Sequence, residues 1–178
     1  RVKLFLLRLL GVVICMQTIC AQDKSKADSL EQVYLTKTLS LTEQIDVLTS
    51  LAQSSPDPKK SLLYSEKLIA FSKSQNSDSS LVDGLLQKGN ALTLKGDLSL
   101  ALQSYFEGVE IVKDMHDLQR LGMLYVAIAG AYSVMDNQSN TVLYYRKGIE
   151  VLRNTDQKRA YASAIENFIH NLYNNPED

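Results

Sequence analysis

The chain has 178 residues, with 19 Lys and Arg against 20 Asp and Glu and a formal net charge of −1. This balance argues against a nucleic-acid-binding protein, because such a site needs a basic stripe. Glycine and proline are sparse, at 8 and 3 residues, and no stretch alternates like a strand, so the composition predicts a nearly all-helical domain.

The N-terminal residues 1–21 have the organisation of a secretory signal peptide. Three basic residues accompany an apolar core over residues 9–16, and a short polar step leads to Ala21, so we predict export and cleavage after Ala21. An uncleaved membrane anchor is the alternative, although an apolar run of about eight residues is short against the roughly 20 needed to span a bilayer. Lipoprotein attachment at Cys15 or Cys20 is disfavoured because neither cysteine follows a small residue.

Cleavage there would give a mature chain without cysteine. The remaining 157 residues would carry 16 basic and 20 acidic side chains, a net charge of about −4. Such a chain can form neither a disulfide framework nor a Cys-ligated metal site. It is long enough for one domain with its own core. We expect this domain outside the cytoplasm, as a periplasmic, secreted or membrane-associated protein.

The rest of the chain is predicted to be a series of helices. Residues 22–40 form a polar lead-in and an N-terminal capping helix at 28–37, which would cover the first face of the stack. Beyond residue 40, apolar residues recur at helical spacing. The predicted helices cover residues 41–53, 59–73, 82–94, 98–114, 121–134, 139–153 and 161–172, and a polar loop is predicted at 74–80.

Residues 82–114 carry the clearest local pattern, two helices joined by a tight corner. Gly96 suits the turn, and Asp97 suits the N-cap of the second helix. Small Gly89 and Ala101 would let the two helices approach closely. Gly89 and Ala101 are followed by an aromatic residue, Tyr105, and by another small residue, Gly108. This order of residues resembles the tetratricopeptide repeat (TPR).

The same frame recurs along the chain and carries Asp57 to Asp97 and Asn137, all good N-caps. The interval is about 40 residues, whereas the commonest TPR repeat has about 34 residues. The chain therefore resembles the longer variety of exported bacterial TPR proteins and of the sensor regions of bacterial signalling proteins. Thr141 replaces the usual alanine of the third repeat, so we expect a slightly splayed hairpin there. The other matching positions of that repeat are Ala129, Tyr132, Tyr145 and Gly148.

The resemblance implies an all-α fold, a right-handed α-solenoid of antiparallel helix pairs with about three and a half repeats. Repeat boundaries are expected at 41–80, 81–120, 121–160 and, in part, 161–178. We call the first helix of each repeat a first-type helix and the second a second-type helix. The last first-type helix, predicted at 161–172, would leave Phe168, Ile169 and Leu172 without a partner helix. Pro176-Glu177 lies at the corner where that partner should begin. We therefore expect the natural chain to continue, and the exposed C-terminal helix to favour self-association.

In the family that the chain resembles, the first helices of successive repeats line a concave groove that accepts a peptide. The two-carboxylate clamp of chaperone-binding relatives is unconvincing here, because Asn90 matches one clamp position but Leu86 stands where a lysine is needed. The groove is expected to have acidic ends and an apolar middle, which suggests a partner with basic and apolar groups. For any one lining residue, the alternative is a solvated face. Carry-over by frame gives Asp83, Leu86, Gln87, Asn90, Leu94, Met123, Val126, Ala127, Gly130, Ser133, Glu166, Asn167, His170 and Tyr173, with Glu43, Asp46, Ser50 and Gln53 from the first repeat.

The sequence offers little chemistry for an enzyme. His116 and His170 are too few and too scattered for a metal site of recognisable spacing. There is no glycine-rich phosphate loop, no Gly-x-Ser-x-Gly elbow and no framed carboxylate pair. We expect no catalytic residue, no metal and no cofactor.

Two functions of different classes stay open. One is an exported, non-catalytic scaffold that binds a protein or peptide partner. The other is the extracytoplasmic sensory segment of a longer signalling protein, such as a histidine kinase or transcriptional regulator. Neither predicts nucleic-acid binding by this segment. Contact with a membrane is expected only through an uncleaved N-terminus or a further C-terminal segment, and an apolar span of about 20 residues after residue 178 would favour the sensor.

Overall fold

The computed structural model describes residues 25–174, and this part of the chain is all-α, with no β-strand. The signal peptide predicted at 1–21, both cysteines and the corner at Pro176-Glu177 lie outside it. The described helices are an N-terminal helix at residues 25–36, α2 (Leu41–Ser54), α3 (Pro58–Ser74), α4 (Asp78–Lys95), α5 (Leu98–Met115), α6 (Leu118–Val134), α7 (Gln138–Arg153) and α8 (Lys158–Asn174).

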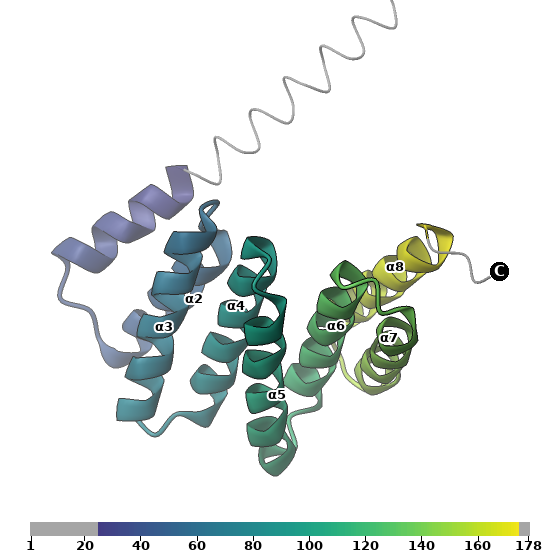
Figure 1. Ribbon diagram of the computed structural model, residues 1–178. Coiled ribbons are helices and arrows are strands. Elements are labelled where there is room, and N and C mark those ends of the chain that lie inside the picture. The colour runs from purple at the N-terminus through teal and green to yellow at the C-terminus, as the bar shows by residue number, and fades with distance from the viewer. Residues whose placement is uncertain (1–24, 175–178) are drawn as a thin grey trace, which may run out of the picture.

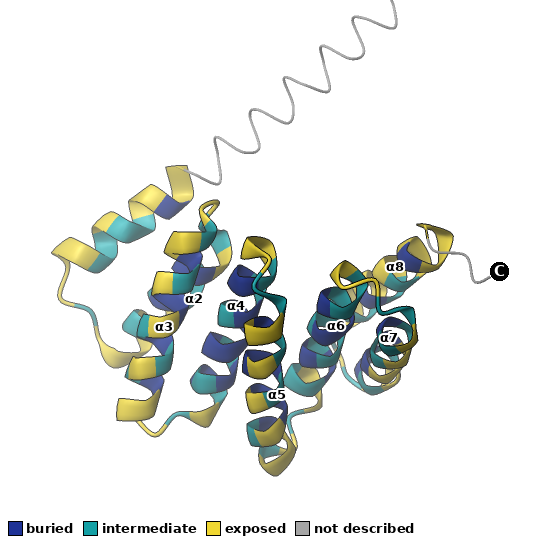
Figure 2. Ribbon diagram, in the orientation of Figure 1, coloured by how far each residue is buried: buried dark blue, intermediate teal, exposed yellow. Residues whose placement is uncertain are grey.

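The helices form a consecutive array in which each one packs against the next along the chain (Figure 1). Additional contacts join α2 to α4, α4 to α6 and α6 to α8. Buried residues lie where neighbouring helices face one another, and exposed residues lie on the outer surfaces (Figure 2). The predicted all-α class is confirmed, and the array is compatible with a helical repeat fold.

The helix starts recur at the predicted interval in two series. The first-type helices begin slightly before the predicted repeat boundaries at 81, 121 and 161. The interval is kept although the residues at matching positions differ and only some of them cap the helix that follows. One series is Asp78, Leu118 and Lys158, for α4, α6 and α8, and the other is Pro58, Leu98 and Gln138, for α3, α5 and α7.

The predicted loop at 74–80 is wrong, because α3 continues to Ser74 and α4 already begins at Asp78. The backbone N–H of Ser77 donates to the carbonyl of Ser72 at 3.0 Å, which closes a short connection over residues 75–77. Asp78 lies in the first turn of α4, where a carboxylate interacts favourably with the free N–H groups and the helix dipole. The polar composition of this stretch therefore marks a helix start and not a loop.

The predicted N-caps are present in two of three cases. Asp57 and Asn137 each accept a backbone N–H from the first turn of the following helix. Asp97 makes no such bond, because its Oδ2 lies 2.8 Å from Nζ of Lys95. The turn before it depends on Gly96, which ends α4 with φ of 83°, a left-handed conformation that glycine adopts without a steric penalty.

The α4–α5 hairpin closes through Gly89 and Tyr105. A Cβ built on Gly89 would lie 2.2 Å from Cε1 of Tyr105, so the ring occupies the space that the missing side chain leaves. Ala101 of α5 is fully buried. Gly108 faces the next hairpin, where a Cβ would lie 3.2 Å from both Leu124 methyl carbons. Small residues therefore set the distance between helices within this hairpin and beyond it.

The predicted splaying of the α6–α7 hairpin is wrong, because α6 and α7 make the most extensive contacts of any described helix pair. Thr141 is fully buried, and its hydroxyl donates to the carbonyl of Asn137, so the polar atom is satisfied inside the helix. A Cβ built on Gly148 would meet Val126 Cγ2 at 2.7 Å and the carbonyl oxygen of Gly122 at 3.2 Å. The glycines of both helices thus bring the backbones together despite the bulkier threonine.

The remaining aromatic repeat positions pack between helices in different ways. Ala129 is fully buried, and because it carries a Cβ where α4 has glycine, Tyr145 has no equivalent recess to enter. The Tyr145 ring instead lies 5.6 Å from that of Phe168 on α8. Tyr132 stacks on Tyr144 at 5.7 Å, with 21° between the ring planes.

The N-terminal helix covers the free side of α2 and α3, as predicted for a capping helix. Leu30 and Tyr34 pack against the buried cluster of α2 and α3. Glu31 accepts hydrogen bonds from Lys60 and from the hydroxyl of Tyr64, and these bonds lower the pKa of its carboxyl. The apolar face and the ionic contacts together hold this helix at the end of the array.

Candidate binding groove

A groove with a volume of about 600 Å³ runs across the first-type helices α4, α6 and α8. Its floor includes Tyr105, Tyr145 and Leu152 from the helices behind. Nine of the residues predicted to line a groove do so, namely Leu86, Gln87, Asn90, Leu94, Met123, Val126, Ala127, Gly130 and Asn167.

Five other residues predicted from the later repeats do not line it, namely Asp83, Ser133, Glu166, His170 and Tyr173. Asp83 is engaged by Arg120, and His170 lies on the exposed surface of α8 with its Nε2 2.8 Å from Asn174 Nδ2. On α8 the groove-facing residues are Ala160, Ser163, Ala164 and Asn167, which form one helical stripe. Glu166, His170 and Tyr173 lie on the adjacent stripe, which turns away from the groove, and Tyr173 is 85% exposed.

The first repeat also contributes nothing to this groove. Glu43 instead accepts from the backbone N–H and hydroxyl of Ser40, forming a capping box at the start of α2. The groove is therefore confined to α4, α6, α8 and the second-type helices behind them, and the first-repeat residues predicted to line it, Glu43, Asp46, Ser50 and Gln53, lie outside.

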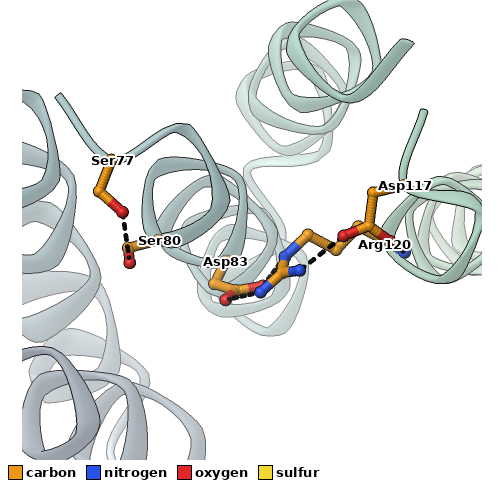
Figure 3. Close-up of polar contacts among 5 residues, drawn as sticks. All are labelled: Ser77, Ser80, Asp83, Asp117 and Arg120. Atoms are coloured by element: carbon orange, nitrogen blue, oxygen red, sulfur yellow. Dashed lines mark hydrogen bonds and ion pairs between the residues drawn. The ribbon is translucent and has the colours of Figure 1, made fainter. Parts of the chain in front are cut away.

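Asp83 serves an inter-helix ion pair (Figure 3). Arg120 of α6 donates Nε to Asp83 Oδ1 at 2.8 Å and Nη2 to Oδ2 at 2.7 Å, while its Nη1 donates to Asp117 at 2.6 Å. The bond to Asp83 raises the pKa of the guanidinium. Burial opposes ionisation of Asp117, but hydrogen bonds from Arg120 outweigh burial and lower the pKa of that carboxyl. The pair ties α4 to α6 beside the groove.

The equivalent contact is missing one repeat earlier. Ser77 and Ser80 occupy the positions that match Asp117 and Arg120 in the preceding repeat, and the Ser77 hydroxyl donates to that of Ser80 at 3.0 Å (Figure 3). A serine cannot span the gap between two helices as arginine does. An ion pair therefore joins α4 to α6, whereas the matching residues of the preceding repeat form no ion pair between α2 and α4.

Among residues 25–174, no charged side chain lines the groove. This contradicts the expectation of acidic ends, because the predicted acidic residues either pair elsewhere or face solvent, and the lining gives no support to a basic partner. Small residues such as Ala127, Gly130 and Ala160 keep the walls low, and a Cβ on Gly130 would meet nothing within 4 Å. Two exposed apolar residues, Leu94 at 74% and Val134 at 59%, extend the apolar surface on the first-type helices.

A chain of hydrogen bonds crosses the polar side of the groove on α4. Thr93 Oγ1 lies 3.2 Å from the Tyr105 hydroxyl, and that hydroxyl donates to Asn90 Oδ1 at 2.9 Å. Asn90 Nδ2 in turn donates to Gln87 Oε1 at 3.3 Å. Burial raises the pKa of Tyr105 to about 12, so the hydroxyl keeps its proton and acts as a donor at neutral pH.

Sequence reasoning missed about half of the lining. The repeat pattern predicts Tyr105 and Tyr145 as structural positions, and both also face the groove. The stripe on α8 could have been found from the spacing of its small residues, which recur at i, i+3, i+4 and i+7. No such signal distinguishes the other residues from the core. The lining residues missed in this way are Thr93, Ala131, Val134, Leu152, Ala160, Ser163 and Ala164.

Other kinds of site find no support in the described part of the chain. Residues 25–174 contain no group of three or more His, Cys, Asp or Glu side chains that could hold a metal ion. None of the helices in that range is long and apolar enough to cross a membrane.

Comparison with known proteins finds no family model that matches this chain and no curated protein with a significant match. The resemblance to TPR proteins therefore depends on the repeat pattern and on the consecutive packing of the helices.

Proposed function

We propose that this chain is a TPR-like right-handed α-solenoid of about three and a half repeats, which acts as an exported, non-catalytic scaffold. In this proposal it binds a peptide or protein segment in the groove across α4, α6 and α8. Such binding follows the general helix-array mode, in which a segment lies across several helices and contacts one stripe of each.

The observation that carries the proposal is the groove itself. It crosses three helices that begin at matching positions of the repeat, and it has a volume of about 600 Å³. That volume lies within the range of about 300–1,000 Å³ typical of ligand sites. Its lining combines apolar side chains with a few carboxamides, which suits a ligand that has both side chains and backbone amides.

A selection from a random dodecapeptide display library against the full chain tests the proposal. The groove should be blocked by Ala127→Arg, which places a long charged side chain among apolar neighbours, so enriched peptides should lose about tenfold or more in affinity. Gln103→Arg, on exposed α5 outside the groove, is the matched control and should leave binding unchanged. Failure to enrich any peptide, or binding that Ala127→Arg does not weaken, would refute the proposed function.

Export is a separate part of the proposal, supported by the N-terminal basic and apolar residues. Terminal sequencing of the protein recovered from outside the cytoplasm should begin at Gln22. A soluble cytoplasmic protein that keeps residues 8–20 would refute the signal peptide.

A further inference from the structure

We propose that the groove selects an uncharged, extended apolar peptide segment, and that Gln87 holds it by donating a hydrogen bond from Nε2 to a backbone carbonyl of that segment. This inference rests on the proposed peptide-binding function and assigns the chemistry of the ligand.

Gln87 is the residue that points to a ligand. It is only 7% exposed, and it lines the groove. Its Oε1 accepts from Asn90, whereas its Nε2 makes no hydrogen bond among residues 25–174. Nε2 is not among the fully enclosed unpaired side-chain atoms of the described residues, so it is accessible from the groove, and a groove ligand that supplies an acceptor can form a hydrogen bond with it.

The neighbouring hydrogen bonds fix which end of the Gln87 carboxamide faces the ligand. Tyr105 donates to Asn90 Oδ1, which leaves Asn90 Nδ2 as the donor toward Gln87. Turning the Gln87 carboxamide over would set two N–H groups against each other. The chain of bonds therefore presents N–H donors to the groove, and the group they recognise must be an acceptor.

The uncharged lining decides which acceptor is favoured. A carboxylate or phosphate would lose its hydration in the groove without meeting a cation, because no Lys or Arg of the described part of the chain lines it. The free energy of hydration that a neutral carbonyl loses is much smaller. Carbonyls within a helix already accept from their own backbone, whereas those of an extended segment are free. An extended peptide with apolar side chains fits both the donors and the walls.

A second carboxamide lies on the opposite wall. Asn167 of α8 lines the groove, is exposed, and makes no hydrogen bond among the described residues. A carboxamide can both donate to and accept from a peptide unit. Gln87 and Asn167 would therefore contact the same segment from two helices, with the small residues of α6 between them.

The display selection provides the first test of this ligand chemistry. Peptides enriched on the full-length chain should be apolar and should lack Asp, Glu, Lys and Arg in their shared core. One enriched peptide, synthesised with acetylated and amidated ends, then serves as the probe in fluorescence titrations.

Two variants remove the Gln87 donor in different ways. Gln87→Met keeps the length of the side chain but removes both the N–H groups and the Oε1 that accepts from Asn90, and it should weaken probe binding about tenfold, the effect of one hydrogen bond of about 1.4 kcal/mol. Gln87→Glu replaces the donors by acceptors and should weaken it further. Gln103→Met, outside the groove, should change nothing. Thermal melts show whether each variant is folded.

Two results would overturn this inference while leaving the proposed function intact. One is enrichment of charged peptides that Ala127→Arg still blocks. The other is full affinity of folded Gln87→Met and Gln87→Glu for a probe that Ala127→Arg blocks. If Ala127→Arg has no effect, or if nothing is enriched, the proposed function itself fails.

Discussion

Replacement of Gly89 by alanine should destabilise the fold, although alanine is the better helix former. A Cβ at this position would lie 2.2, 2.5 and 2.6 Å from three ring atoms of Tyr105. The ring is 1% exposed and its hydroxyl is held by Asn90, so it cannot move into solvent. The helices or the ring must therefore shift, and the hydrogen bonds of the groove shift with them.

The magnitude follows from two opposing terms. Glycine to alanine inside a helix contributes about 1 kcal/mol of stability, whereas overpacking a core costs typically about 1–3 kcal/mol and sometimes more. With three ring atoms inside contact distance, we expect the overpacking cost at the upper end, about 3 kcal/mol, which leaves a net destabilisation of about 2 kcal/mol. Gly130→Ala is the matched control, because it lies in a helix with nothing within 4 Å of its Cβ and should be stabilised by about 1 kcal/mol.

Thermal denaturation of the two variants decides the matter. For a chain of this size 1 kcal/mol corresponds to about 2–4 °C in Tm, so Gly89→Ala should melt several degrees below the wild type and Gly130→Ala slightly above it. Combining Gly89→Ala with Tyr105→Leu should cost less than the two single changes added together, because the smaller side chain removes the clash. If Gly89→Ala proves as stable as Gly130→Ala, the placement of Tyr105 against α4 is wrong.

Three further outcomes are expected. In urea titrations, Tyr105→Phe should lower the free energy of unfolding by about 1 kcal/mol, because it removes the hydroxyl that donates to Asn90. The Tyr145 hydroxyl makes no hydrogen bond among the described residues, so Tyr145→Phe should cost less than about 0.5 kcal/mol. Because the pKa of Asp117 is lowered in the folded state, its contribution to stability is present above the ordinary value of 3.8 and is lost as the pH falls through the folded value. Asp117→Asn should therefore reduce the loss of stability at acid pH. An unchanged profile of stability against pH would count against the ion pair with Arg120. Hydrogen exchange should be faster in α8 than in α5, because Ile169 is 60% exposed and few α8 residues are buried, and equal protection in a monomer would show that another element covers α8.

The sequence alone determined the helical class and the interval at which helices begin. Both are local properties, because an N-cap such as Asp57, a proline such as Pro58 and a glycine such as Gly96 act on the residues next to them. Apolar spacing then shows that each helix needs a neighbour. The same local physics explains the error at residues 74–80, where serines and an acidic residue suit a helix start as well as they suit a loop.

Only the tertiary structure decided which face of each helix lines the groove and what charge that face carries. Phe168 of α8 packs its ring 5.6 Å from that of Tyr145 on α7, a contact between different helices that no local pattern encodes. The repeat frame predicts Asp83 as an acidic groove residue, but in the structure Arg120 Nε lies 2.8 Å from Asp83 Oδ1. The interval of the repeat predicts which positions match between repeats. It does not predict which side chains contact one another, because ion pairs and ring contacts form between side chains that differ from repeat to repeat.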